Sequence, residues 1–140
     1  MLSKFVKAIE DGDGCGNMPI KLMSDIHLET PIFSKTYALY KLFYTCLAGF
    51  PKRDRYALGQ RCEETLLKLM EGIIAATSQP QPKKLTILKR ACGRLDMMKV
   101  WLRLAADLKL LDRKKYIELE EMVQEIGRML GGWMRSVRNG

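Results

Sequence analysis

Hydrophobic residues recur at helical spacing along most of the chain. The first such segment, from Ser34 as a candidate N-cap to about Gly49, has apolar side chains over more than half of the helix circumference. A helix of this kind needs contacts on two sides. Phe50-Pro51 interrupts the pattern, and a second segment with one apolar face follows to about Thr77. No segment shows the strict alternation that is typical of a half-buried strand.

The next two helical segments are longer. The third follows a proline-containing loop and runs from Lys83 to about Lys109. The fourth runs from Arg113 to Trp133 or beyond, with Asp112 as a candidate N-cap and a single apolar face along its length.

A pair of adjacent glycines, Gly131-Gly132, lies within the apolar pattern of the fourth segment. Each glycine costs roughly 1 kcal/mol relative to alanine in a helix interior, yet the pattern continues to Trp133 and Val137. Either the helix stops at the glycines, or another backbone packs closely against it there.

Short connections make successive helices antiparallel, and four apolar faces fill one core. We therefore expect an all-α protein, an up-down-up-down four-helix bundle, with residues 31–140 as the bundle domain. Residues 1–30 are expected to be an N-terminal extension or linker. Their glycine- and aspartate-rich run, Asp11–Asn17, does not fit the spacing of a calcium-binding loop.

The third segment carries a second apolar stripe in addition to the face expected to pack in the core. At 100° per residue this stripe projects to a different side of the helix. A monomeric bundle of this size has one core, so a second stripe that includes a tryptophan favours a subunit or partner interface. The alternative is a widened core. The residues of the stripe are Met97, Val100, Trp101, Leu104 and Leu108.

Positive charge is in excess and clustered. The net charge of +8 and the pI near 9.4 predict attraction to polyanions, whether nucleic acid, an anionic membrane surface or an acidic protein. Basic residues gather where helices begin, and the free N–H groups of a helix N-terminus already favour anions. The candidates at the joins and along the third helix are Lys52, Arg53, Arg55, Lys83, Lys84, Arg90, Arg94 and Arg103.

The alternative interpretation of these basic residues is that they border the core and confer solubility. Aromatic residues are not interleaved with them as a base-stacking surface requires. The pattern therefore favours contact with the phosphate backbone, without reading of sequence.

Recognisable catalytic chemistry is absent from the sequence. There is no nucleophile with a partner, no glycine-rich phosphate loop and no Glu-x-x-His repeat, so we expect no enzyme activity and no cofactor. Cys15, Cys46, Cys62 and Cys92 lack close spacing and His27 is the single histidine, which indicates reduced thiols and no metal site. No apolar run is long enough to span a bilayer and no secretory signal begins the chain, so we expect a cytoplasmic protein with no membrane partner.

Four motifs, in the same order, resemble the accessory variability determinant (Avd) proteins of diversity-generating retroelements. They begin at Pro31, Phe50, Trp101 and Ile126 and read PIFSKTY, FPKRDRYALGQR, WLRLA and IGRMLGGW. The resemblance covers residues 31–135, and the closing Gly-Arg-x-Leu-Gly-Gly-Trp pattern is its most specific part. The four-helix proteins encoded in ribosomal RNA intervening sequences are similar in length and plan, but they fit that closing motif less well.

The resemblance implies a four-helix protomer that assembles into a basic, barrel-shaped homopentamer. It also implies binding to the reverse transcriptase of the same retroelement and to template RNA and cDNA. The protein would then be a non-catalytic accessory in mutagenic retrohoming, the synthesis and use of mutagenised cDNA.

Roles carried over by position fall into two groups. Phe50-Pro51 and Gly59 resemble structural positions, and the residues that shape packing or the subunit contact are Trp101, Gly131, Gly132 and Trp133. The basic residues expected to contact RNA or the reverse transcriptase are Lys52, Arg53, Arg55, Arg61, Arg90, Arg94 and Arg103. The residues before about His27 depart from the family pattern, because the usual short Avd lacks such an extension.

Two other functions stay open from the sequence. One is a stand-alone basic RNA-binding protein of the ribosomal RNA intervening-sequence type. The other is a purely structural oligomer whose charge confers solubility alone.

Overall fold

A computed structural model describes residues 30–140, and these residues form helices without a strand. The helices are α3 (Pro31–Leu47), α4 (Lys52–Asp54), α5 (Gln60–Ser78), α6 (Lys83–Asp107) and α7 (Arg113–Asn139). The π-helical segment η1 (Arg55–Gly59) joins α4 to α5, so that the backbone is helical from Lys52 to Ser78. The prediction of an all-α protein with four long helices is confirmed.

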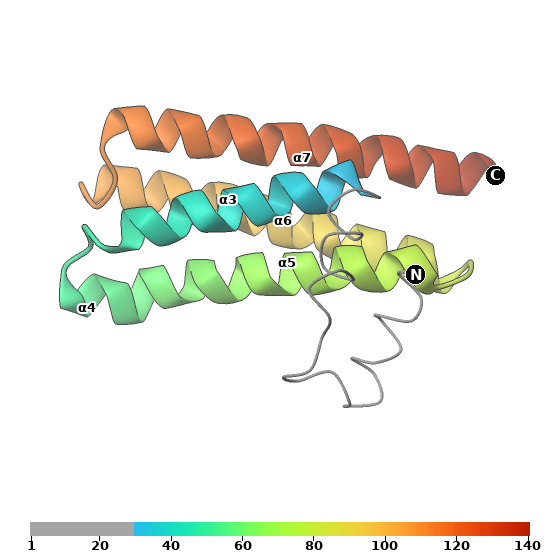
Figure 1. The fold of residues 1–140 in the computed structure, drawn as a ribbon, viewed down its shortest axis with the longest axis horizontal. Coiled ribbons are helices and arrows are strands. Elements are labelled where there is room, and N and C mark those ends of the chain that lie inside the picture. Colours follow the sequence, from blue (N-terminus) through green and yellow to red (C-terminus); the bar gives the residue numbers. More distant parts are fainter. Residues whose placement is uncertain (1–29) are drawn as a thin grey trace.

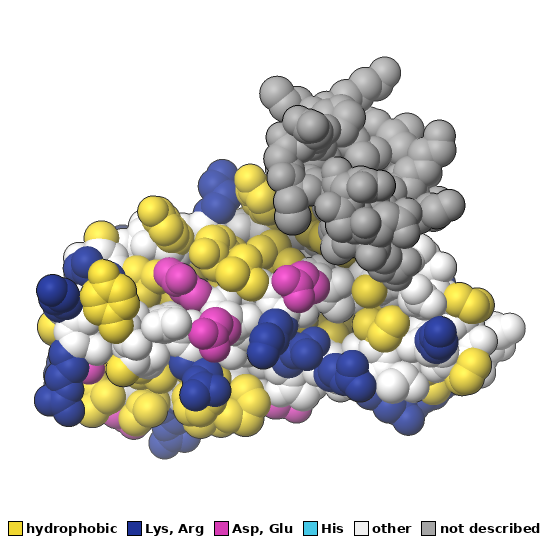
Figure 2. Space-filling model, turned by 90° about the horizontal axis from the view of Figure 1, so that it is seen from below, with side chains coloured by type: hydrophobic (Ala, Val, Ile, Leu, Met, Phe, Trp, Pro, Cys, Tyr) yellow, Lys and Arg dark blue, Asp and Glu magenta, His cyan; other side chains and the backbone are white. Residues whose placement is uncertain are grey.

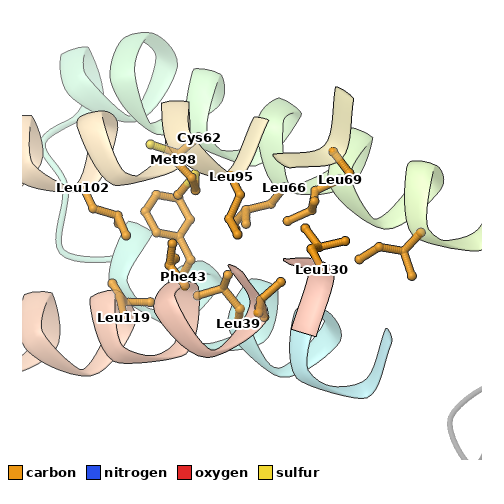
Figure 3. Packing of buried hydrophobic residues seen from close by; sticks show 14 of the residues in the cluster. Leu39, Phe43, Cys62, Leu66, Leu69, Leu95, Met98, Leu102, Leu119 and Leu130 are labelled. Atoms are coloured by element: carbon orange, nitrogen blue, oxygen red, sulfur yellow. The ribbon is translucent and has the colours of Figure 1, made fainter. Parts of the chain in front are cut away.

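Successive long helices run antiparallel, as Figure 1 shows. α3 packs against α5 and α7, and α6 packs against the same two helices, so α3 and α6 lie diagonally across the bundle. The four apolar faces meet on the central axis, where Figure 3 shows Leu39 and Phe43 of α3 among leucines of the other helices. The wide apolar face of α3 therefore contacts two neighbours, as its pattern indicates.

α3 begins earlier than the sequence analysis predicts. Thr30 occupies the N-cap position and Pro31 the first helical position, so the prediction of Ser34 as N-cap is wrong. Proline is favoured at that position because its φ is already helical and it has no N–H group to leave unpaired. The Ser34 N–H instead donates to the Thr30 carbonyl at 3.1 Å, within the first turn.

The connection between α3 and α4 is fixed by a buried phenylalanine. Phe50 packs edge-on against Phe43, with ring centroids 6.1 Å apart, and Pro51 is the N-cap of α4. Gly59 permits the close approach of this connection, because a Cβ at that position would lie only 2.7 Å from Cδ2 of Leu47. The structural roles expected for Phe50-Pro51 and Gly59 agree with these contacts.

The connection between α6 and α7 uses a helix C-cap of the Schellman type. The Leu110 N–H donates to the Ala105 carbonyl and the Lys109 N–H to the Ala106 carbonyl, with Lys109 at a φ of 63°. Two residues later the Asp112 carboxylate accepts a hydrogen bond of 2.7 Å from the Lys115 N–H. Asp112 is therefore the N-cap of α7, as predicted.

α7 continues through the double glycine to Asn139, which confirms the prediction of a helix from Arg113 to Trp133 or beyond and excludes the alternative that the helix stops at the glycines. Beyond the glycines, Trp133, Met134 and Val137 pack against the edge of the core. The Gln81 side-chain amide also donates to the Val137 carbonyl, which ties the α5–α6 loop to the last turns of α7. These contacts hold the final turns in place despite the low helix propensity of glycine.

The division of the chain into residues 1–30 and 31–140 stays a prediction. Several expectations, namely the linker at Asp11–Asn17 and the roles of Cys15 and His27, lie outside the described residues. Within residues 30–140, no helix is long and apolar enough to cross a membrane.

Candidate interaction surfaces

Four of the five residues of the second apolar stripe of α6 are exposed in the single chain. Its members Met97, Val100, Leu104 and Leu108 are 42%, 53%, 41% and 55% exposed. The core face of the same helix, by contrast, is fully covered at Leu88, Met98 and Leu102. The four exposed side chains therefore form an apolar strip about three turns long that the rest of residues 30–140 leaves in contact with water.

Trp101 lies at the inner edge of this strip. Its ring is half-buried and packs against the core, and its indole nitrogen is shielded from solvent without a hydrogen-bond partner among the described residues. An unpaired buried N–H group costs about 1–3 kcal/mol. Trp101 is thus partly a core residue, whereas the other stripe residues project outward.

The double glycine forms a small half-exposed surface on α7. A Cβ at Gly131 would lie 3.5 Å from Nη1 of Arg135, and one at Gly132 would lie 3.8 Å from Nη2 of the same guanidinium. No backbone among residues 30–140 packs closely here, so the second alternative from the sequence is not met within the protomer. Trp133 beside them is half-buried and belongs to the edge of the core.

Some of the basic candidate residues lie at the two ends of the bundle. Lys52 and Arg53 lie at the α3–α4 connection, at the end where α7 also begins (Figure 1). Lys83 and Lys84 open α6 at the opposite end, near the C-terminus. The two ends are separated by the length of α6, about 38 Å for its 25 residues at 1.5 Å each. The structure therefore does not unite these residues in one cluster.

The remaining basic candidates lie along the sides of the bundle. Arg61, Arg90 and Arg103 are exposed, and Arg94 is half-buried with its guanidinium over Gly72 of α5. None of these four has an acidic partner within 4.0 Å among residues 30–140. Arg55 differs, because it donates to the Phe50 carbonyl at 3.2 Å and so helps to close the α3–α4 connection. Figure 2 shows one face on which basic and hydrophobic side chains adjoin.

A groove between α3 and α5 was not predicted from the sequence. It has a volume of about 490 Å³ and is lined by Tyr37, Tyr40, Lys41, Tyr44, Thr45 and Met70. The available signal was the spacing of three and four residues between the tyrosines, which places them on one face of α3. The apolar pattern counts Tyr40 and Tyr44 as part of the wide hydrophobic face of this helix, but Tyr44 is 64% exposed. We call this feature the tyrosine groove.

Burial lowers the reactivity of the three cysteine thiols within residues 30–140. Cys46, Cys62 and Cys92 are free thiols, and burial raises the pKa of each. The effect is largest for Cys62, whose pKa rises to about 12, so this thiol is fully protonated at neutral pH. No group of three histidine, cysteine or acidic residues within 30–140 is placed to hold a metal ion.

These features define a class of protein: a basic four-helix bundle with an exposed apolar strip and basic side chains at both ends. The family model described as bAvd-like matches residues 32–137, and the chain belongs to this family. The match confirms the resemblance to Avd proteins that the four sequence motifs indicate. No curated protein matches the chain.

Proposed function

We propose that the protein is a non-catalytic accessory protein of a diversity-generating retroelement. It binds the reverse transcriptase of the same element, together with template RNA and cDNA, and supports mutagenic cDNA synthesis in the cytoplasm. The observation that carries this proposal is membership of the bAvd-like family over residues 32–137. The exposed basic side chains that have no acidic partner within residues 30–140 support the nucleic-acid part of the proposal.

Self-association is the second part of the proposal. The exposed strip of Met97, Val100, Leu104 and Leu108 would be covered by a second copy, and repetition of that contact would build the homopentamer. Trp101 at the edge of the strip and the double glycine of α7 would contribute to the packing. An exposed apolar strip beside a half-buried tryptophan is the usual composition of a subunit contact.

Co-expression with the reverse transcriptase and template RNA of the same locus tests the proposal. We expect the protein to have five times the mass of the chain and to retain both partners through moderate salt. Retention of RNA without the polymerase would favour the ribosomal RNA intervening-sequence type instead. Loss of both partners would leave only the structural oligomer.

Two double variants with reversed charges, compared with each other, test which surface binds RNA. Arg90→Glu with Arg94→Glu lowers the net charge from +8 by two units per substitution, to +4. Lys99→Glu with Arg128→Glu makes the same change in a hollow between α6 and α7 that already contains Asp96. We expect the first variant to lose far more RNA affinity than the second, with a shallower dependence on salt because fewer phosphates are neutralised. Equal losses would mean that net charge alone drives binding.

A further inference from the structure

The tyrosine groove contains a stacked pair of aromatic rings, one of which is exposed to solvent and does not belong to the hydrophobic core. Tyr40 and Tyr44 have ring centroids 6.5 Å apart and planes inclined by 29°, and the outer ring, that of Tyr44, is 64% exposed. The groove volume of about 490 Å³ lies within the roughly 300–1,000 Å³ range of pockets that hold small organic molecules. An aromatic hollow of this size accepts a flat ring.

Cationic side chains adjoin these rings. Nζ of Lys41 lies 5.6 Å from the centroid of the Tyr37 ring, inside the groove lining. An adjoining hollow shares Tyr44 and contains Arg55. Lys41 of α3 and Arg55 of η1 therefore both lie beside the tyrosine rings.

We propose that the tyrosine groove is a stacking site for unpaired bases of single-stranded RNA. The inference rests on the proposed function and adds a second mode of contact to phosphate binding. Base–aromatic stacking tolerates any sequence because every base has a π-face, and it works together with a basic surface that follows the backbone. Here Tyr44 supplies the exposed ring, while Lys41 in the groove and Arg55 in the adjoining hollow supply positive charge for the phosphates of the strand.

Charge favours a nucleic acid over an apolar protein segment as the occupant. No acidic residue is among the six that line the groove, and the whole chain carries +8. The nearest acidic residue is Glu63, which lines the adjoining hollow together with Arg55. Burial and, secondarily, Glu63 raise the pKa of Tyr40, so its phenol is neutral at physiological pH and does not repel an anionic strand.

The test uses the full-length chain with two short RNA probes of equal length: oligouridine and the corresponding abasic oligomer. Tyr44→Ala removes the ring, Tyr44→Phe keeps it, and Tyr56→Ala removes a tyrosine of similar exposure, 66%, outside the groove. We expect Tyr44→Ala to weaken oligouridine binding roughly 5- to 150-fold, the equivalent of one lost base stack. Tyr44→Phe and Tyr56→Ala should bind as the wild type does.

The abasic probe separates this inference from the proposed function. Wild-type protein should bind it more weakly than oligouridine, and Tyr44→Ala should bind both probes alike, with an unchanged salt dependence. Equal wild-type affinity for the two probes would overturn stacking and leave phosphate binding intact, whereas failure to bind either probe would overturn both proposals. If Tyr44→Ala releases the reverse transcriptase but keeps its oligouridine affinity, the groove is a protein-binding site and the inference is wrong.

Discussion

Replacing both Gly131 and Gly132 by alanine separates the stability of helix α7 from the stability of a subunit contact. In a helix interior alanine is better than glycine by roughly 0.8–1.0 kcal/mol per residue. Residues 30–140 leave room for both methyl groups, because the atoms of these residues that lie nearest to them belong to the flexible end of Arg135, 3.5 and 3.8 Å away. An isolated protomer should therefore gain about 2 kcal/mol in its free energy of unfolding.

The proposed subunit contact predicts the opposite effect on assembly. If a second chain packs closely at the glycines, each added methyl group overpacks the contact at a cost of roughly 1–3 kcal/mol. Every interface of a closed ring would carry that cost, so the ring should dissociate at a much higher protein concentration than the wild type does. Sedimentation over a concentration series measures this shift, and urea unfolding of the dissociated protomer measures the gain.

Ser136→Ala is the matched control for the double alanine variant. Ser136 is exposed on the same helix, and its replacement raises helix propensity without adding volume. It should leave the native mass unchanged. A double alanine variant that is more stable than the wild type and retains its native mass would refute the placement of the glycines in a subunit contact.

Three further predictions concern assembly, a turn and a buried thiol. Val100→Glu with Leu104→Glu should give soluble monomers with unchanged helical content, measured by sedimentation and circular dichroism; wild-type mass would exclude the α6 strip as the interface. Lys109→Gly should raise the free energy of unfolding by about 1 kcal/mol, because Lys109 has a φ of 63° that glycine adopts without strain. The pKa of Cys62 rises on folding from 9.0 to about 12, so the unfolded chain releases this proton first as the pH rises. Stability should therefore fall above about pH 9, by up to roughly 1.4 kcal/mol per pH unit, and Cys62→Ala should flatten that slope in urea unfolding.

Periodicity alone predicts most of the fold because each long helix buries one continuous face. Leu95 and Leu102 of α6 are fully or almost fully covered, as their spacing indicates. Helix ends and local irregularities depend on finer interactions. The π-helical turn at Arg55–Gly59 is not visible in the hydrophobic pattern of the sequence. The start of α3 at Pro31 depends on the backbone preference of proline rather than on hydrophobicity.

The candidate surfaces are harder to predict, because sequence gives residue types but not the distances between them. Lys52 and Lys83 read as members of one basic set, yet they lie at opposite ends of the bundle. The tyrosine groove was missed for a different reason. Tyrosine counts as apolar in a periodicity analysis, so the wide apolar face predicted for α3 includes Tyr40 and Tyr44, whereas the packing of α3 leaves the Tyr44 ring exposed.

The outer face of α6 combines two requirements that oppose each other. Its second half carries the apolar strip, and its first half carries Arg90 and Arg94 on nearly the same side of the helix. Copies that associate through the strip would bring their basic residues close together. Because each chain carries a net charge of +8, the electrostatic repulsion grows with every chain that is added. A bound polyanion removes that cost. Under the proposed function, assembly and RNA binding are therefore linked, and linkage is reciprocal: RNA stabilises the oligomer by the same factor by which the oligomer strengthens RNA binding.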